Sequence, residues 1–263
     1  MKLTFLGTCS GTEPIEGYRH VSFTLATDGG VYLFDAGDSC AYTAHVMGID
    51  LLSARAVFIS HTHMDHIGGL PFLVATLFKL AGMAGGAGYP LAGGKLEVLI
   101  PDRACWEGVL GMLGTDESDP LLPFRFHAHT YADGEVFDDG SVRVTALHNE
   151  HLGAPTPPGP WRSFSFRIEA EGKSIVYSGD VKHISELAPL AGAGCDLLLM
   201  ETGHHVIPEV CRYLRDAAWP IGRTAFIHHG RATLADPDGE RRKGSDILGR
   251  EVLVLMDRQR MTL

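Results

Sequence analysis

Ser60-His61-Thr62-His63-Met64-Asp65-His66-Ile67-Gly68-Gly69 follows the short apolar run Ala56-Val57-Phe58-Ile59. Three imidazoles and one carboxylate within six positions are too many polar groups for an ordinary core segment. At an extended strand end, His61, His63 and Asp65 share one side, and His66 breaks that alternation, as it does if a helix begins there. Imidazole and carboxylate are ligands that Zn, Mn and Fe prefer, so the stretch predicts a metal site rather than a solvated loop.

The residues of this motif and its flanks resemble a known family. The pattern His-x-His-x-Asp-His after an apolar strand resembles the signature of the metallo-β-lactamase superfamily. Phe5-Leu6-Gly7-Thr8-Cys9-Ser10-Gly11 and Leu33-Phe34-Asp35-Ala36-Gly37 resemble the ribonuclease Z-like branch, and the similarity runs through nearly the whole chain. The resemblance implies an α/β fold, an αββα four-layer sandwich of two mixed sheets flanked by helices. We expect one such domain over residues 1–263, with metals at the edge between the sheets.

Composition limits the partners and the compartment. The 263 residues carry 22 Lys and Arg against 32 Asp and Glu, a formal net charge of −10. This charge disfavours long nucleic acids as partners but leaves small anionic substrates open, because bound divalent metals offset it locally. Five widely spaced cysteines without a Cys-x-x-Cys pair argue against a disulfide framework. With no signal peptide and no apolar run of membrane-spanning length expected, we predict a soluble cytoplasmic protein.

Apolar runs and turn residues outline the remaining elements. The pattern predicts a hairpin of strands over 21–26 and 31–35, helices over 40–47, 70–80, 103–113 and from 208 to about 217, and strands over 3–6, 96–100, 124–129, 142–147, 163–168, 173–177, 196–200, 224–229, 251–256 and 260–263. The glycine-rich residues 81–94 predict a loop that is either a linker or a lid. Residues 231–243 read as a polar loop.

Histidines and carboxylates at later strand ends complete the predicted ligand set. His148 ends an apolar strand as the first motif does, and we expect it rather than His151, which we place at the substrate rim. Asp180, in Ser-Gly-Asp, resembles the family residue that bridges two metals. The last ligand is His229, or His228 if the register slips by one residue. The predicted ligands are therefore His61, His63 and His148 for one metal, Asp65, His66 and His229 for the second, and Asp180 between them.

The resemblance implies two further roles, one for Asp35 and one for Glu201 with a following histidine. Asp35 resembles a residue that orients the histidine loop without binding the metal. Glu201, with His204 or His205, resembles a pair that donates a proton to the leaving group, although the family usually separates the two by a longer insertion. His127 and His129 also alternate, but no carboxylate accompanies them in the sequence, so we interpret them as surface histidines.

Together these residues predict a hydrolase. Two divalent ions, Zn in preference to Mn or Fe, would hold a bridging hydroxide, and Asp65 would help to orient it. A phosphodiester in a small nucleotide or cyclic phosphate is the favoured substrate, because no long basic insertion resembles the family's transfer-RNA-binding arm. The alternatives are a thioester or lactone (acyl) hydrolase and an iron-dependent oxygen or persulfide enzyme. Similar proteins are frequently dimers, so a homodimer is compatible with this reading.

Overall fold

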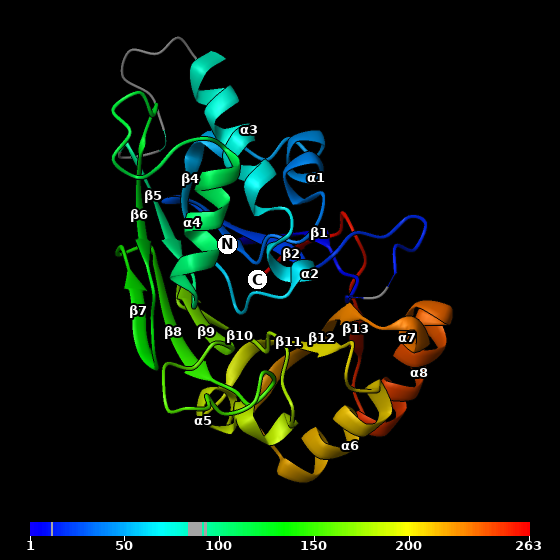
Figure 1. Cartoon of the computed structure of the whole chain (residues 1–263). Helices are drawn as coiled ribbons and strands as arrows, with labels where there is room; N and C mark the ends of the chain where they lie inside the picture. The colour runs from blue at the N-terminus through cyan, green and yellow to red at the C-terminus, as the bar shows by residue number, and fades with distance from the viewer. Residues whose placement is uncertain (12, 84–90, 92–93) are drawn as a thin grey trace.

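Two β-sheets stack face to face, and helices cover both outer faces (Figure 1). The computed structural model describes residues 1–11, 13–83, 91 and 94–263, and within them each sheet has seven strands. The first sheet runs in the order β14 (Arg260–Thr262), β1 (Lys2–Gly7), β2 (Ser22–Thr27), β3 (Gly30–Phe34), β4 (Ala54–Phe58), β5 (Lys95–Leu99), β6 (Arg125–His129). The second runs β13 (Val252–Val254), β12 (Ile221–His229), β11 (Cys195–Thr202), β10 (Lys173–Tyr177), β9 (Phe164–Ala170), β8 (Val142–His148), β7 (Gly134–Asp138).

The helices divide between the two sheets. On the first sheet lie α1 (Cys40–Val46), the 3-10 turn η1 (Leu51–Ser53), α3 (Leu70–Met83) and α4 (Arg103–Met112). On the second lie η2 (Ile184–Leu187), α5 (Ala188–Ala191), α6 (Ile207–Ala217), α7 (Arg231–Ala235) and α8 (Pro237–Leu248). The short helix α2 (Met64–Ile67) lies between the two halves (Figure 1). The predicted αββα sandwich is confirmed.

Successive side chains of a strand point to opposite faces of its sheet, so one strand contributes to two hydrophobic cores. On β4, Ala56 and Phe58 face the other sheet, whereas Val57 packs under the helices. The inter-sheet core is aromatic: Phe34 stacks on Phe58 with ring centroids 4.8 Å apart. Full burial of such a side chain contributes roughly 1.5–3 kcal/mol, so this layer holds the two sheets together.

Parallel strands bring together the polar side chains that follow their carboxyl ends. β3 and β4 run parallel in the first sheet, and β10, β11 and β12 run parallel in the second. The carboxyl ends of parallel strands meet at one edge of a sheet, and side chains that follow those ends collect there. Both sheets therefore present their strand ends to the same crevice.

Three elements, in two stretches of the chain, differ from the sequence-based expectation. β7 was not expected, because its residues Gly134-Glu135-Val136-Phe137-Asp138 run into the turn residues that follow. The prediction of a polar loop over 231–243 is wrong, since α7 and α8 form there. Asp236 caps α8 by accepting a hydrogen bond from Gly239 N at 2.9 Å, and Pro237 stands in the first turn. Gly249, at φ 69°, ends the helix.

Two other expectations concern the stretch after the histidine motif. By length and apolarity alone, the helical stretch Met64–Met83 would suffice to cross a membrane, contrary to the expectation that none would. Leu70, Leu73 and Leu77 of this stretch are buried in the core beneath the first sheet, which accounts for its composition. Of the glycine-rich residues 81–94, residues 84–90, 92 and 93 lie outside the described part of the chain, so the loop predicted there stays a prediction.

Candidate metal centre

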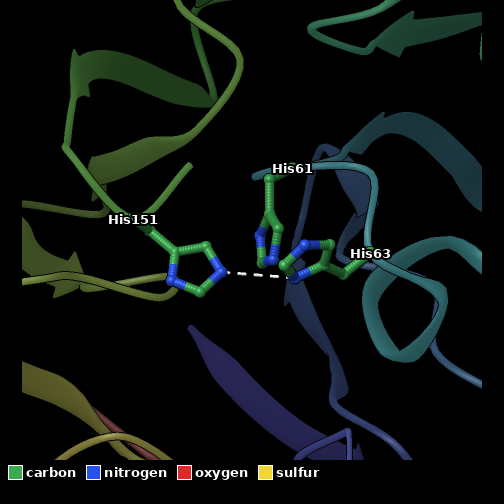
Figure 2. Close-up of side chains that lie close together, drawn as sticks. All are labelled: His61, His63 and His151. Carbon is green, nitrogen blue, oxygen red and sulfur yellow. Dashed lines mark hydrogen bonds between the residues drawn. The ribbon is translucent and has the colours of Figure 1, made fainter. Parts of the chain in front are cut away.

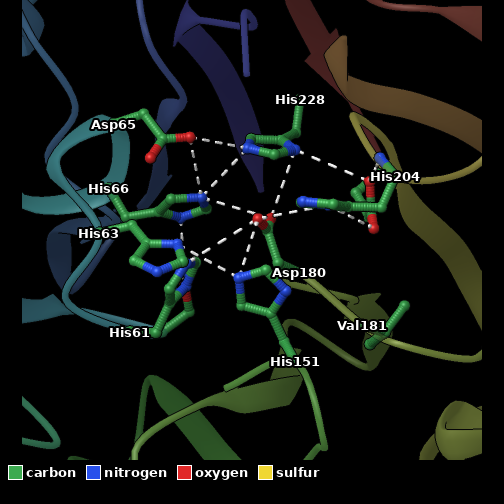
Figure 3. A network of polar contacts seen from close by, with 12 residues as sticks. His61, His63, Asp65, His66, His151, Asp180, Val181, His204 and His228 are labelled. Atoms are coloured by element: carbon green, nitrogen blue, oxygen red, sulfur yellow. Dashed lines mark hydrogen bonds and ion pairs between the residues drawn. The ribbon is translucent and has the colours of Figure 1, made fainter. Parts of the chain in front are cut away.

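Eight histidine and carboxylate side chains converge at the crevice between the two halves (Figure 3). The loop after β4 and helix α2 supply four of them, and the ends of β8, β10, β11 and β12 supply the others. They are His61, His63, Asp65, His66, His151, Asp180, His204 and His228.

Asp180 lies at the middle of this cluster (Figure 3). Its Oδ1 is 3.3 Å from both His66 Nε2 and His228 Nδ1. Its Oδ2 is 3.8 Å from His61 Nε2 and 3.7 Å from His151 Nε2. One carboxylate thus faces two separate groups of side chains, one with each oxygen.

The first group consists of His61, His63 and His151 (Figure 2). His151 Nε2 lies 3.2 Å from His63 Nδ1, and the His61 ring centroid is 4.7 Å from that of His63 and 4.8 Å from that of His151. Burial lowers the pKa of His61 well below its usual value and lowers that of His151 to about 4. Both imidazoles are therefore neutral near pH 7, the form that binds a metal.

The second group consists of Asp65, His66 and His228. Asp65 Oδ2 lies 2.9 Å from His228 Nε2, which in turn lies 3.2 Å from His66 Nε2. Burial alone would lower the pKa of His228, but Asp180, Asp65 and Glu201 raise it to about 9. The carboxylates around these two imidazoles thus favour a positive charge at this buried position.

Unpartnered buried atoms provide the test of whether metal ions fit. Within the described residues, His61 Nε2, Asp180 Oδ1 and His228 Nδ1 are buried without a hydrogen-bond partner. Each such atom costs roughly 1–3 kcal/mol if it stays unsatisfied. Two divalent cations, one beside each group, would satisfy all three atoms and offset the buried negative charge, and nitrogen and oxygen donors suit Zn, Mn and Fe. The residues fit two such ions, one beside each group.

Asp35 positions His66 of the second group through a hydrogen bond. It is buried at φ 54° at the end of β3, and its Oδ2 accepts hydrogen bonds from His66 Nδ1 at 2.8 Å and from the Tyr177 hydroxyl at 2.7 Å. Its Oδ1 accepts one from Ser60 N at 2.7 Å. A carboxylate can only accept, so His66 Nδ1 carries the proton and Nε2 is left free to face Asp180. The orienting role expected for Asp35 agrees with this geometry.

His148 does not join the cluster, contrary to expectation. Its Nδ1 donates to Asp133 Oδ2 at 2.6 Å, and its ring stacks on Trp161 at 4.1 Å. It is the last residue of β8, paired with Phe164, and its side chain turns outward. The turn that follows the strand brings His151 into the cluster instead of the rim position expected for it. The strand that ends in His148 therefore leads to the turn that brings a histidine into the cluster, but that histidine is His151.

His229 is also placed outside the cluster, and His228 lies within it. The pairing of β11 with β12 shifts between Glu201 and Thr202, and His228 occupies the resulting bulge at φ 55°. His229 consequently faces the opposite way, where Nε2 donates to Leu255 O at 2.6 Å and Nδ1 lies 2.8 Å from Thr202 Oγ1. Strand alternation in the sequence cannot reveal a bulge, which moves one extra residue across the sheet.

Glu201 and its two following histidines occupy distinct positions. His204 Nδ1 lies 3.2 Å from Glu201 Oε1, and this hydrogen bond raises the pKa of His204. The His204 side chain is 47% exposed and lines the crevice. His205 is largely buried, and its Nε2 donates to Val181 O at 3.0 Å. Only His204 of the pair combines a carboxylate partner with access to the crevice.

The cluster opens into a cavity of about 540 Å³. Ser10 and Gly11 of the loop after β1, His20 and Gly203 line it together with cluster residues. A Cβ at Gly11 would lie 3.0 Å from the Asp65 carboxylate carbon, so this loop approaches the cluster closely because Gly11 has no side chain.

The chain is similar to several solved structures and curated proteins. It matches the metallo-β-lactamase fold protein YhfI from Bacillus subtilis with a TM-score of 0.74 and 17% identity over 99% of both chains. It matches the short form of human tRNase Z with a TM-score of 0.70 and 19% identity over 100% of this chain and 99% of the other. Ribonuclease Z of Mycobacterium bovis is 28% identical over 202 residues, which are 76% of this chain and 69% of that protein.

These similarities, the fold and the histidine–carboxylate cluster define the class: the metallo-β-lactamase-fold hydrolases, in their ribonuclease Z-like branch. The superfamily that the histidine motif predicts is thereby confirmed. Within this class the chain belongs to the family of the anti-Pycsar protein Apyc1, whose model matches residues 1–205.

Proposed function

We propose that this protein hydrolyses phosphodiester bonds in small nucleotides or cyclic phosphates with two divalent metal ions. The observation that carries the proposal is the position of Asp180 between two groups of ligand-type side chains, each with a buried nitrogen that lacks a hydrogen-bond partner. Site residues in this proposal are His61, His63 and His151 for one ion, Asp65, His66 and His228 for the other, and Asp180 for both.

The proposed chemistry divides between the ions and the protein. Bound ions of this kind, with zinc as our first choice, supply an activated water and neutralise charge on the attacked phosphate. Asp65 lies at the cavity wall and orients the attacking water by accepting a hydrogen bond from its O–H group. His204 donates a proton to the departing oxygen, because its pKa is raised beside Glu201 and its ring reaches the cavity. His205 positions the loop through its bond to Val181.

Two features support a small phosphate-containing substrate. The cavity of about 540 Å³ lies within the range of small-molecule sites and matches a nucleotide better than a folded nucleic acid. The net charge of −10 opposes a long polyanion, whereas two divalent ions would attract a short anion locally. The relatives named ribonuclease Z carry a name that denotes cleavage of RNA, whose backbone consists of phosphodiesters. This supports a phosphodiester as the bond that is cleaved, but it does not bear on the size of the substrate.

Activity on defined substrates tests the proposal. Protein loaded with zinc or manganese should hydrolyse bis(p-nitrophenyl) phosphate and a panel of cyclic mononucleotides. Asp65→Asn should lower kcat/KM by at least about 100-fold while the fold is retained, because it replaces the negatively charged carboxylate at the cavity wall with a neutral amide. Asp133→Asn, which alters an aspartate beside His148 instead, is the matched control and should retain activity. Metal-loaded protein that cleaves thioesters or lactones and no phosphodiester would refute the proposal.

A further inference from the structure

A second group of ligand-type side chains comes from strands β5 and β6. These strands lie at one edge of the first sheet, with β6 outermost (Figure 1). His127 and His129 alternate on β6, and Glu97 stands opposite His127 on the parallel strand β5. The strand β6 itself carries no carboxylate beside these histidines. Pairing of two strands about thirty residues apart supplies it.

The distances in this group suit a metal ion. His129 Nε2 lies 3.1 Å from Glu97 Oε2, and His127 Nδ1 lies 3.5 Å from Glu97 Oε1. One ligand atom from each of the three residues lies within 4.8 Å of the others. In a tetrahedral zinc site with bonds of roughly 2.0–2.1 Å, neighbouring ligand atoms are about 3.3 Å apart, so little movement is needed.

Exposure and charge also favour a cation here. His127 is 49% exposed and His129 is 57% exposed, whereas Glu97 is 15% exposed and so held in place. Glu97 and His129 line a groove of about 560 Å³ whose other charged residues are mostly acidic. The groove contains the carboxylates of Glu97, Asp133, Glu135, Asp138 and Asp139 against the cations Arg55 and Lys95.

Lys95 occupies part of the position that an ion would take. Its Nζ lies 2.7 Å from Glu97 Oε1, and its side chain is 49% exposed at the start of β5. An ammonium on a long exposed stem can swing into water at small cost, so it acts as a competing cation and not as a permanent partner. Its presence shows that the Glu97 carboxylate already attracts positive charge.

We propose that Glu97, His127 and His129 form a peripheral binding site for one borderline divalent transition-metal ion, with zinc as the best-suited member of that class. Two imidazoles and one carboxylate leave a fourth position open toward the groove. None of the three residues belongs to the metal centre described above. The site ties the edge strand β6 to β5 and is independent of hydrolysis.

Zinc titration of the full-length, metal-stripped protein against a chromophoric chelator tests this site. We expect His127→Gln/His129→Gln to bind one equivalent of zinc fewer than the wild type. His45→Gln, an exposed histidine on α1, is the matched control and should bind the wild-type number. Lys95→Gln should bind zinc more tightly at the peripheral site, since it removes the competing cation.

The outcomes separate this inference from the proposed function. Phosphodiester hydrolysis should be unchanged in the double variant, and the difference of one equivalent does not depend on whether the protein hydrolyses phosphodiesters at all. Equal zinc stoichiometry and affinity in the wild type and the double variant overturns the inference. Weaker zinc binding in Lys95→Gln also overturns it, because a lysine that competes with the ion cannot assist its binding.

Discussion

His151 and His148 lie three residues apart, yet only one of them faces the metal centre. His151 Nε2 is 3.2 Å from His63 Nδ1, whereas His148 is engaged with Asp133 and Trp161. This contrast assigns the two histidines opposite sensitivities to substitution. The same loop therefore contains both a test residue and its control.

Loss of a residue that only hydrogen-bonds to a metal ligand typically lowers activity by roughly 10–100-fold. We predict that His151→Ala lowers kcat/KM for phosphodiesters by more than this, because His151 is proposed to bind the ion itself. His148→Ala should change it by less than about threefold, because only a partly exposed hydrogen bond and a stacking contact are lost. Steady-state kinetics at saturating metal check both values. Equal effects of the two substitutions would contradict the assignment.

His229 predicts a pH dependence of stability. Burial lowers its pKa to about 4 from the usual 6.5. As the pH falls below 6.5, the unfolded chain therefore takes up a proton before the folded one does, and stability that is complete above pH 6.5 is lost toward pH 4. At pH 5 this loss amounts to about 2 kcal/mol.

His229→Gln removes this titration, because the amide can still donate to Leu255 O and does not ionise. The variant should be less stable than the wild type at pH 7.5, with a smaller difference at pH 5. Urea unfolding at both pH values measures the two differences. A difference that is the same at pH 5 and pH 7.5 would count against a neutral, buried His229.

At the scale of elements, α8 depends on one glycine where it meets α6. A Cβ at Gly244 would lie 2.7 Å from Ile207 Cγ2 and 3.0 Å from Val252 Cγ2, and both are methyl groups of β-branched side chains with little freedom to move. Gly108 on α4 is also within a helix, but a Cβ there would meet no heavy atom within 4 Å. The two glycines form a matched pair.

Gly244→Val should lower the free energy of unfolding by about 1–3 kcal/mol through overpacking. Gly108→Val should change it by less than about 0.5 kcal/mol, because valine has at least the helix propensity of glycine and the surface there is open. Urea denaturation checks both. A tolerated Gly244→Val would mean that α6 and α8 do not pack as closely as described.

Elements also mark the limits of the sequence-based predictions. The hairpin of β2 and β3 was confirmed, because its turn residues and apolar runs are local signals. α8 was missed because its charged residues read as a loop, although Asp236, Pro237 and Gly249 are start and stop signals that could have revealed it. Long-range pairing, as of Glu97 with His127, leaves no mark in the local sequence.

The candidate site divides in the same way. Residues His61 to His66 are contiguous, so their shared location could be predicted from one motif. The sequence left His228 only as the alternative to His229 and favoured His148 over His151, because a turn after β8 and a bulge in β12 decide which of two nearby histidines faces the centre. The structure places a histidine in the cluster three residues after the favoured His148 and one residue before the favoured His229.

At the scale of the whole molecule, the centre joins two similar halves. The first half supplies His61, His63, Asp65 and His66, and the second supplies Asp180, His151 and His228. Each half is a mixed sheet with helices on one side, and neither half alone gathers a complete ligand set. The central claim is therefore that Asp180 holds two ions across this boundary.

Anomalous diffraction from crystals grown with zinc tests that claim most directly. We predict two anomalous peaks, one on either side of the Asp180 carboxylate and roughly 3.5–4 Å apart, with His151 beside one and His228 beside the other. A single peak at Asp180, or peaks beside His148 or His229 instead, would contradict the account.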